Sequence, residues 1–228
     1  MPKIRDKLQI IGTEIEKSVS KYQRPKDTVQ LLAVSKHHSI AMIREAYEAA
    51  QESFGENYVQ ELVEKSQALA DLDIDWHFIG PLQSNKTKQI AEVANWVHTV
   101  DRLKIAQRLN DQRPENMPPL NICMQINISG EASKSGVTAE ELPALAKDIA
   151  ELPRLNLRGL MAIPAPESDF EKQRTTFAKV SRLKKKLNQY GYHLDTLSMG
   201  MSSDMEAAIA EGATIVRIGT AIFGTRNI

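Results

Sequence analysis

The sequence predicts a single-domain (β/α)8 barrel with an extra helix at its N-terminus. The length of 228 residues lies in the range of one α/β barrel. Short apolar stretches alternate eight times with helical patterns, and such alternation is typical of a parallel sheet. No change in composition marks a domain boundary, so we expect one domain over residues 1–228.

The first part of the chain begins with an amphipathic helix. Ile4, Leu8 and Ile11 recur at helical spacing with charged residues between them, and Pro25 follows the end of the pattern. Ser39 is placed to cap a second helix. The elements expected here are a helix at about 3–22, a strand at 29–35, a helix at 40–50, a strand at 53–55 and a helix at 58–69.

The middle of the chain continues the alternation. Gly80 and Pro81 end the third strand, while Ser84 and Asp101 are placed to cap helices. Three prolines within residues 113–119 predict a loop. The elements expected here are a strand at 75–80, a helix at 84–94, a strand at 96–100, a helix at 101–109 and a strand at 120–128.

The last part of the chain supplies three further strands. Thr138 and Glu141 have the spacing of a capping box, Pro164 ends the sixth strand, and Gly191 is placed to end a long helix. The elements expected here are a helix at 138–149, a strand at 155–163, a helix at 169–190, a strand at 194–199, a short helix at 205–211 and a strand at 213–218.

An open doubly wound sheet is the alternative architecture. Such a sheet usually carries a glycine-rich turn after its first strand. Ser35, Lys36 and His37 occupy that position here, which favours the closed barrel.

The composition excludes several classes of function. Apolar residues make up 42% and charged residues 25% of the chain, and the formal net charge is zero with both signs intermixed, so we expect neither a nucleic-acid nor a membrane partner. No apolar run reaches the ~18 residues of a membrane span, and the start lacks the apolar centre of a signal peptide. The single cysteine, Cys123, and the spacing of the five histidines argue against a metal cluster. We expect a cytoplasmic monomer.

Lys36 stands at the carboxyl end of the first strand, just before a helix. Parallel α/β folds place reactive groups at this end of their strands. Partial burial lowers the pKa of a lysine and frees a neutral amine that can attack an aldehyde. Taken alone, Lys36 also fits a solvated lysine in a strand-to-helix loop.

Two other strand ends together predict an anion site. Residues 198–204 form a turn rich in glycine and serine that leads into a helix, and residues 217–220 close the eighth strand with Gly219. Barrels often bind phosphate in the loops after strands seven and eight. A phosphate there and an amine at the first strand suit a phosphorylated aldehyde, of which pyridoxal 5'-phosphate is the commonest cofactor.

The chain also resembles a known family, the pyridoxal phosphate homeostasis proteins. The resemblance runs from about Val29 to Gly224 and depends on several motifs in one order: AVSKHHS, FGENYVQE, WHFIGPLQSNK, INISGEASKSG, RGLMAIPAP, LSMGMSSDMEAAI and VRIGTAIFG. It implies a single barrel similar to the N-terminal domain of alanine racemase. It also implies pyridoxal phosphate as the cofactor, reversibly bound.

The resemblance implies a role for each of eight residues. Lys36 would hold the cofactor as an internal aldimine, and Arg217 would face the pyridine nitrogen. The phosphate would be bound by Ser202, Gly219 and Thr220. The residues around the ring would be Asn57, Met161 and Ser198.

Arg217 favours a binding protein over an enzyme. A carboxylate beside the pyridine nitrogen keeps it protonated and makes the ring a strong electron sink, whereas an arginine cannot accept that proton. We also expect no second domain to supply the other acid/base group of a racemase. The first hypothesis is therefore a protein that holds pyridoxal phosphate and delivers it to apo-enzymes, with amino acids exchanging at Lys36 by transaldimination.

Two alternatives stay open, together with one secondary site. A slow racemase would need Tyr58, His77 or His98 as the missing acid/base group, although the alternating pattern favours His77 as an inward-facing, barrel-filling residue. A Schiff-base aldolase on a sugar phosphate is the third hypothesis. Lys134, in a loop after the fifth strand, is a candidate second site for free cofactor.

Overall fold

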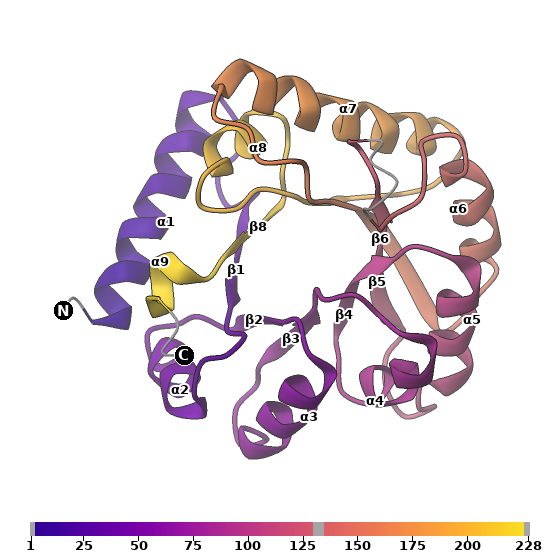
Figure 1. The fold of residues 1–228 in the computed structure, drawn as a ribbon, viewed down its shortest axis with the longest axis horizontal. Coiled ribbons are helices and arrows are strands. Elements are labelled where there is room, and N and C mark those ends of the chain that lie inside the picture. The colour runs from indigo at the N-terminus through magenta and orange to yellow at the C-terminus, as the bar shows by residue number, and fades with distance from the viewer. Residues whose placement is uncertain (1–2, 130–134, 226–228) are drawn as a thin grey trace.

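The strands of this chain close into a parallel barrel, as the computed structural model shows for residues 3–129 and 135–225 (Figure 1). They follow one another around the barrel in chain order, and β8 pairs with β1 to close it. Their bounds are β1 Gln30–Val34, β2 Ser53–Glu56, β3 Asp75–Phe78, β4 Trp96–Val100, β5 Leu120–Ile126, β6 Leu155–Ala162, β7 Thr196–Ser198 and β8 Ile215–Ile218. The predicted fold class is confirmed.

Helices form a ring outside the strands (Figure 1). Their bounds are α1 Ile4–Lys21, α2 Ile40–Glu48, α3 Val59–Ala68, α4 Thr87–Ala91, α5 Leu103–Gln112, α6 Leu142–Ala150, α7 Phe170–Gln189, α8 Met205–Ala210 and α9 Thr220–Phe223, with a 3₁₀ turn η1 at Ser84–Lys86. None of the helices in the described part of the chain is long and apolar enough to cross a membrane.

Strand residues alternate between two apolar environments, as the period of two requires. One set packs outward against the helices in a large core that includes Ala33 and Phe54. The other set faces the barrel interior. Its apolar members form two small clusters, Leu32, Val34, Ile79 and Ile215 in one and Trp96, Cys123 and Met161 in the other. The inward-facing row continues toward the carboxyl end of each strand, where its side chains line the mouth of the barrel.

The N-terminal helix α1 packs against α2, α8 and α9. Its apolar face is buried, because Leu8, Ile11 and Ile15 recur at the spacing of one helix face. Arg24 holds the end of this helix in place, since its Nη1 donates to the carbonyl oxygens of Ile209 at 3.0 Å and of Ala213 at 2.6 Å. The helix therefore covers the place where β8 meets β1.

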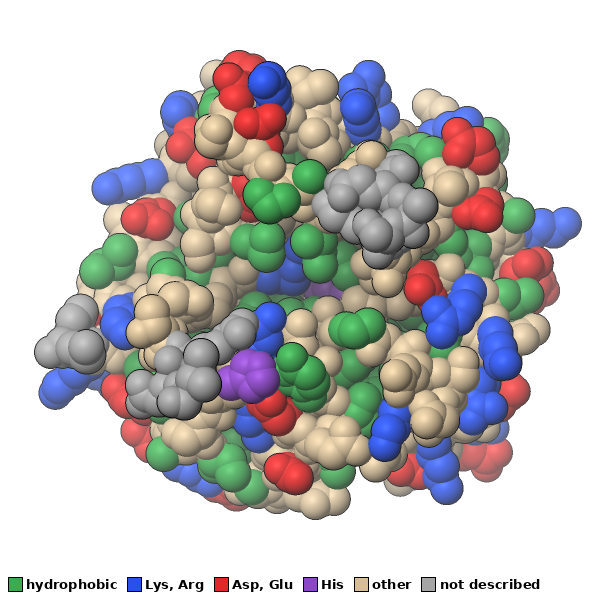
Figure 2. All heavy atoms as spheres, in the orientation of Figure 1, with side chains coloured by type: hydrophobic (Ala, Val, Ile, Leu, Met, Phe, Trp, Pro, Cys, Tyr) green, Lys and Arg blue, Asp and Glu red, His purple; other side chains and the backbone are tan. Residues whose placement is uncertain are grey.

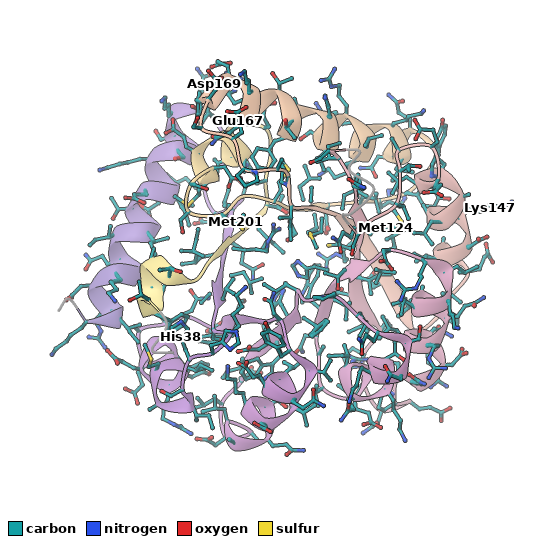
Figure 3. All side chains as sticks on the ribbon, in the orientation of Figure 1. His38, Met124, Lys147, Glu167, Asp169 and Met201 are labelled. Atoms are coloured by element: carbon teal, nitrogen blue, oxygen red, sulfur yellow. The ribbon has the colours of Figure 1, made fainter. Side chains whose placement is uncertain are left out.

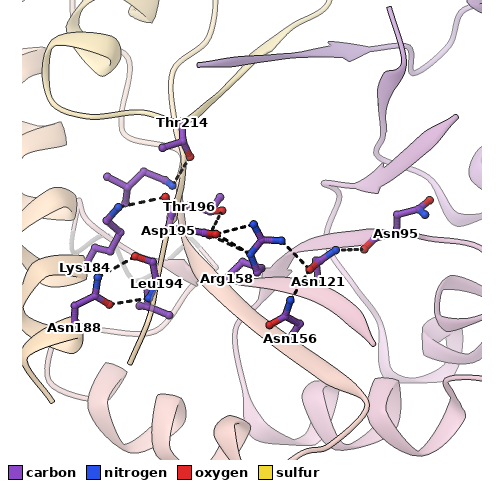
Figure 4. A network of polar contacts seen from close by, with 11 residues as sticks. Asn95, Asn121, Asn156, Arg158, Lys184, Asn188, Leu194, Asp195, Thr196 and Thr214 are labelled. Carbon is purple, nitrogen blue, oxygen red and sulfur yellow. Dashed lines mark hydrogen bonds and ion pairs between the residues drawn. The ribbon is translucent and has the colours of Figure 1, made fainter. Parts of the chain in front are cut away.

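A polar network ties β5, β6 and β7 together where these strands begin (Figure 4). Arg158 donates to both carboxylate oxygens of Asp195, with Nη2 at 2.7 Å from Oδ2. Arg158 Nη1 also donates to Asn121 Oδ1 at 3.0 Å, and Asn156 donates to the same oxygen at 2.9 Å. The guanidinium lies over the ring of Trp96, 4.8 Å from its centroid. Charge-assisted hydrogen bonds of Arg158 thus join the starts of three neighbouring strands at this end of the barrel.

Several predicted helix caps form as expected. Ser39 accepts a hydrogen bond from the Met42 N–H. Asp169, which was not predicted as a cap, also accepts one from the Lys172 N–H at 2.9 Å at the start of α7. Thr138 and Glu141 make the reciprocal bonds of a capping box, one turn before α6 begins. These residues were identifiable because a cap depends on its immediate neighbours in sequence.

Two predicted helix starts are wrong. Ser84 begins a 3₁₀ turn, and its carbonyl oxygen accepts from the Thr87 hydroxyl at 2.9 Å and from Arg108 Nε at 2.7 Å. Asp101 does not cap α5, because its carboxylate pairs with Arg102 at 2.6 Å and Arg102 takes the N-cap position. At Asp101 the neighbouring arginine takes the carboxylate that would cap the helix, whereas at Ser84 the helical turn begins one residue early, with Gln83 at the N-cap position.

Candidate functional site

Lys36 lies half-buried at the mouth of the barrel. It follows Val34 by two residues, and Val34 faces the interior, so Lys36 continues the same inward-facing row. The next residue, His37, has a left-handed backbone with φ of 64°, and its N–H donates to Glu61 Oε2 at 2.8 Å. The loop that carries the lysine is therefore held to α3.

A buried charge cluster supports this loop from outside the barrel. Glu56 is fully buried, and its Oε1 accepts from the Ser35 hydroxyl at 2.7 Å and from Lys65 Nζ at 2.8 Å. Lys65 also donates to the Ser35 carbonyl oxygen at 2.9 Å and to Glu61 Oε2 at 2.7 Å. Burial raises the pKa of Glu56 to about 7, against the opposing effect of Lys65. Sequence reasoning missed this cluster, because it depends on α3 packing over β2 and β3, which brings Lys65 to Ser35 in the loop after β1.

Arg217 lies inside the barrel on β8 with 5% of its surface exposed. Its Nη1 donates to the Ser198 carbonyl oxygen at 2.6 Å and to Ser198 Oγ at 2.8 Å, and its Nη2 donates to the Ala162 carbonyl oxygen at 2.9 Å. Burial lowers the pKa of this guanidinium to about 10, which still leaves it charged at neutral pH. The barrel thus holds a fixed cation beneath its mouth.

Two histidines lie beneath Arg217 and contact each other. His98 Nδ1 is 2.7 Å from Ser198 Oγ, and His98 Nε2 is 2.9 Å from His77 Nδ1. His77 stacks on Trp96, with an angle of 4° between the rings. His77 is inward-facing as predicted and His98 is fully buried, so neither side chain lies free at the mouth. Inward-facing positions on adjacent strands were the sequence signal for this contact.

The turn after β7 presents hydroxyl groups at the same end of the barrel. Gly200 has φ of 99°, and a Cβ there would lie 2.6 Å from Ala208 Cβ, so this position requires glycine. Asp204 accepts from the Met201 N–H at 2.6 Å, which fixes the turn. Ser202 lies between these two residues and is exposed.

Gly219 lets the end of β8 approach β1 closely. A Cβ at Gly219 would lie 3.0 Å from the Val34 carbonyl oxygen, closer than side chains normally pack. Thr220 follows, exposed, at the start of α9. The two residues therefore lie next to the strand that leads into Lys36.

Asn57 and Met161 complete the predicted set. A Cβ at Gly80 would lie 1.9 Å from the Asn57 carbonyl oxygen, so a glycine there allows the end of β3 to pass over Asn57. Asn57 Oδ1 is buried and has no hydrogen-bond partner among the described residues. Met161 is fully buried beside Trp96 and Cys123.

All eight predicted residues belong to the mouth end of the barrel. Six of them are at inward-facing positions, namely Lys36, Asn57, Met161, Ser198, Arg217 and Gly219. The other two, Ser202 and Thr220, lie in the segments after β7 and β8. Figure 2 shows a hollow in the middle of one face, with basic and histidine side chains at its floor. His38, after β1, and Met201, after β7, lie beside the centre of the barrel in the same view (Figure 3).

Lys134, the candidate second site, lies outside the described residues. Within the described ranges, no cluster of His, Cys, Asp and Glu side chains could hold a metal.

Comparison with known proteins decides the family. A pyridoxal phosphate homeostasis protein of Pseudomonas aeruginosa is 55% identical over 227 residues, which cover 100% of this chain and 97% of that protein. The chain belongs to the pyridoxal phosphate homeostasis protein family. Consistent with this membership, the model of the alanine racemase N-terminal domain family matches residues 14–227.

Solved structures agree with this family and fold. PipY of Synechococcus elongatus PCC7942, whose structure was determined with pyridoxal phosphate bound, is 37% identical with a TM-score of 0.86, and the match covers 97% of this chain and 100% of PipY. Alanine racemase of Clostridium difficile 630 is 14% identical with a TM-score of 0.75, over 94% of this chain and 57% of the racemase. The second likeness concerns the fold alone.

Proposed function

We propose that this protein binds pyridoxal 5'-phosphate reversibly through the Lys36 amine and takes part in the intracellular homeostasis of that cofactor. The observation that carries the proposal is that Lys36, two residues after β1, and Arg217, on the neighbouring strand β8, both occupy inward-facing positions at the mouth. The name of its relatives and the cofactor bound to PipY support the same conclusion.

The residues at the mouth fit the chemistry of this cofactor. When bound, pyridoxal phosphate supplies an aldehyde that condenses with an amine, an aromatic ring and a dianionic phosphate. Lys36 offers the amine, and the exposed hydroxyls of Ser202 and Thr220 with the backbone at Gly219 offer donors to a phosphate. Asn57 Oδ1 is a buried acceptor without a partner among the described residues, which suits a ligand group that donates to it.

Arg217 favours binding over turnover. The guanidinium has only donors, so it cannot accept a hydrogen bond from a protonated ring nitrogen as a carboxylate does, and it favours the neutral nitrogen. His77 and His98 are both buried and hydrogen-bonded to each other beneath Ser198, and the ring of Tyr58 is exposed in the loop before α3. Neither histidine is available at the mouth as an acid or base. Tyr58 does lie at the mouth end, after β2, so the preference for binding depends on Arg217 and not on the position of Tyr58. We therefore place the binding role ahead of a racemase or an aldolase.

The proposed role includes release of the cofactor. Amino acids would exchange with Lys36 by transaldimination, and apo-enzymes would receive the cofactor that leaves. We further expect a cytoplasmic monomer without nucleic-acid or membrane partners, in keeping with the net charge of zero.

The decisive experiment compares the wild type with Lys36→Ala and with Lys104→Ala, an exposed lysine of α5. Each protein is titrated with pyridoxal phosphate, reduced with borohydride and analysed by peptide mass spectrometry. We expect a visible absorbance band and a cofactor adduct on Lys36 in the wild type and in Lys104→Ala, and neither in Lys36→Ala. An adduct only on another lysine would refute the proposal.

Turnover is checked with the same protein. Incubation of the cofactor-loaded wild type with L-alanine, followed by chiral analysis, should yield D-alanine well below ~1 turnover per second. A rate at or above that value would replace the binding role with a racemase activity.

A further inference from the structure

A row of polar side chains crosses the barrel interior from the N-terminal end of β3 to Arg217. Four contacts build it: Asp75 Oδ2 to His77 Nε2 at 2.8 Å, His77 Nδ1 to His98 Nε2 at 2.9 Å, His98 Nδ1 to Ser198 Oγ at 2.7 Å, and Ser198 Oγ to Arg217 Nη1 at 2.8 Å. The members come from β3, β4, β7 and β8. Asp75 is partly exposed at the outer end, whereas the other four are buried.

Only one arrangement of hydrogens satisfies this row when both rings are neutral. A guanidinium can only donate, and an ionised carboxylate can only accept. His77 must therefore give its one ring hydrogen, from Nε2, to Asp75. His98 must give its Nε2 hydrogen to His77 Nδ1, and Ser198 must give its hydroxyl hydrogen to His98 Nδ1. The hydrogens of His77, His98 and Ser198 then all point away from Arg217. Ser198 Oγ therefore has a lone pair directed toward the guanidinium.

The burial of His98 supports a neutral ring. The side chain has no exposed surface, and this burial, with His77 and Arg217 as neighbours, lowers the pKa of His98 well below its usual value. The stacking of His77 on Trp96 fixes the plane of the second ring. Both rings are thus held in orientations that serve the contacts above.

We propose that Asp75, His77 and His98 are positioning residues for Arg217, acting as one relay in which each side chain fixes the hydrogen of the next. The relay orients the Ser198 hydroxyl, and that hydroxyl accepts from Arg217. Without the relay the hydroxyl can rotate, and Arg217 retains only the carbonyl acceptors of Ser198 and Ala162. The effect on the cofactor rests on the proposed function, in which Arg217 lies beneath pyridoxal phosphate.

The first test uses the wild type without cofactor. In ¹⁵N NMR spectra of histidine-labelled protein at neutral pH, we expect the Nε2–H tautomer for His77 and for His98, with Nδ1 unprotonated in both rings. His193, which is exposed and lies outside the row, serves as the internal reference for the spectra. An Nδ1–H tautomer at His98, or a doubly protonated ring in the row, would overturn the relay.

The second test is a double-mutant cycle on the affinity for pyridoxal phosphate. His77→Phe keeps a ring against Trp96 and removes both nitrogens. We expect it to weaken cofactor binding about tenfold in the wild-type background, and by less than about twofold in the Ser198→Ala background, because the relay is already cut there. His193→Phe is the matched control and should leave the affinity unchanged.

The outcomes separate the relay from the proposed function. Equal effects of His77→Phe in both backgrounds would mean that His77 acts through packing alone, and would refute the relay while leaving cofactor binding intact. A wild type that binds no pyridoxal phosphate would refute the proposed function, and the NMR test would still decide the relay. If His77→Phe does not fold, the wild-type spectra decide it as well.

Discussion

At the scale of single residues, the buried pair of Glu56 and Lys65 near the mouth should respond to pH. Lys65 makes three hydrogen bonds, whereas Glu56 Oε2 has no partner among the described residues. An unpaired carboxylate oxygen away from water favours the protonated acid, which explains a pKa of about 7. The loop carrying Lys36 is therefore hydrogen-bonded, through Ser35, to the Glu56 carboxyl group, which titrates near physiological pH.

Glu56 should make the stability of the protein fall as the pH rises. The pKa is raised from 4.5 to about 7 on folding, so the stabilisation is complete below the unfolded value and is lost as the pH rises through the folded one. Glu56→Gln imitates the protonated acid and lacks this titration. Between about pH 5 and about pH 8, we expect the wild type to lose roughly 1–3 kcal/mol of unfolding free energy relative to the variant in urea titrations. Parallel pH profiles of the two proteins would contradict this assignment.

At the scale of elements, the segment after β3 approaches the segment after β2 closely. Gly80 follows β3, and its Cα faces the backbone of Asn57, which follows β2. The Thr99 hydroxyl donates to the Gly80 carbonyl oxygen at 2.7 Å and holds the segment from the side of β4. The end of β3 therefore fixes where Asn57 stands, although Gly80 itself contributes no functional group.

A methyl group at Gly80 should damage both the fold and the site. The obstacle is backbone rather than the flexible end of a side chain, so we expect Gly80→Ala to lower the unfolding free energy by about 3 kcal/mol and to weaken pyridoxal phosphate binding. Gly12→Ala is the control, because nothing lies within 4 Å of the added Cβ in helix α1, and it should stabilise by about 0.5–1 kcal/mol. Urea titration and cofactor titration measure the two effects. Equal stabilities of the two variants would contradict this account.

Local sequence patterns predicted most elements, because each pattern depends on neighbours a few residues away. The apolar run before Lys36 and the helical spacing of Ile4, Leu8 and Ile11 are of this kind, and β1 and α1 form where expected. Helix starts failed at Asp101, where the adjacent arginine took the capping carboxylate, and at Ser84, where a 3₁₀ turn with Gln83 at its N-cap position precedes α4.

The candidate site divides in the same way. Positions such as Lys36 and Arg217 follow from strand ends and from motifs, so the sequence was sufficient to propose them. The contacts of Lys65 with Glu56, and of His98 with Ser198, join residues that only the closed barrel brings together, the second pair across 100 positions of sequence. The alternation of side chains along a strand predicts which strand residues point into the barrel, but it does not predict which atoms of those residues come into contact.

At the scale of the whole molecule, the barrel separates stability from the proposed function. One end carries the network of Arg158, Asp195 and Asn121 (Figure 4), and the other end carries the mouth with Lys36. Barrels generally place their reactive groups at the carboxyl ends of the strands, so residues at the opposite end serve mainly the fold. A substitution in the network should therefore lower the stability of the fold and leave cofactor binding unchanged.

Asp195→Asn should lower stability and spare cofactor binding. Burial opposes ionisation of Asp195, but the hydrogen bonds from Arg158 and Thr196 outweigh it and hold the pKa of the carboxyl below its usual value. Because 56% of the Asp195 side chain is exposed, we expect a loss of only about 1 kcal/mol at neutral pH, less at high salt. The deficit should begin to shrink as the pH falls below about 4, the value for the unfolded chain, and should vanish only below the lowered pKa of the folded carboxyl, where the wild type also loses this charge.

The matched control for this substitution is Asp73→Asn, which removes the same charge from an exposed loop residue and should cost almost nothing. Urea titrations at low and high salt measure the stability of both variants, and cofactor titration should give affinities within about twofold of the wild type. Because Arg158 also lies over Trp96, on which His77 stacks, a large loss of affinity in Asp195→Asn would show that the two ends of the barrel are coupled through this stack. That result would contradict the separation of stability from cofactor binding.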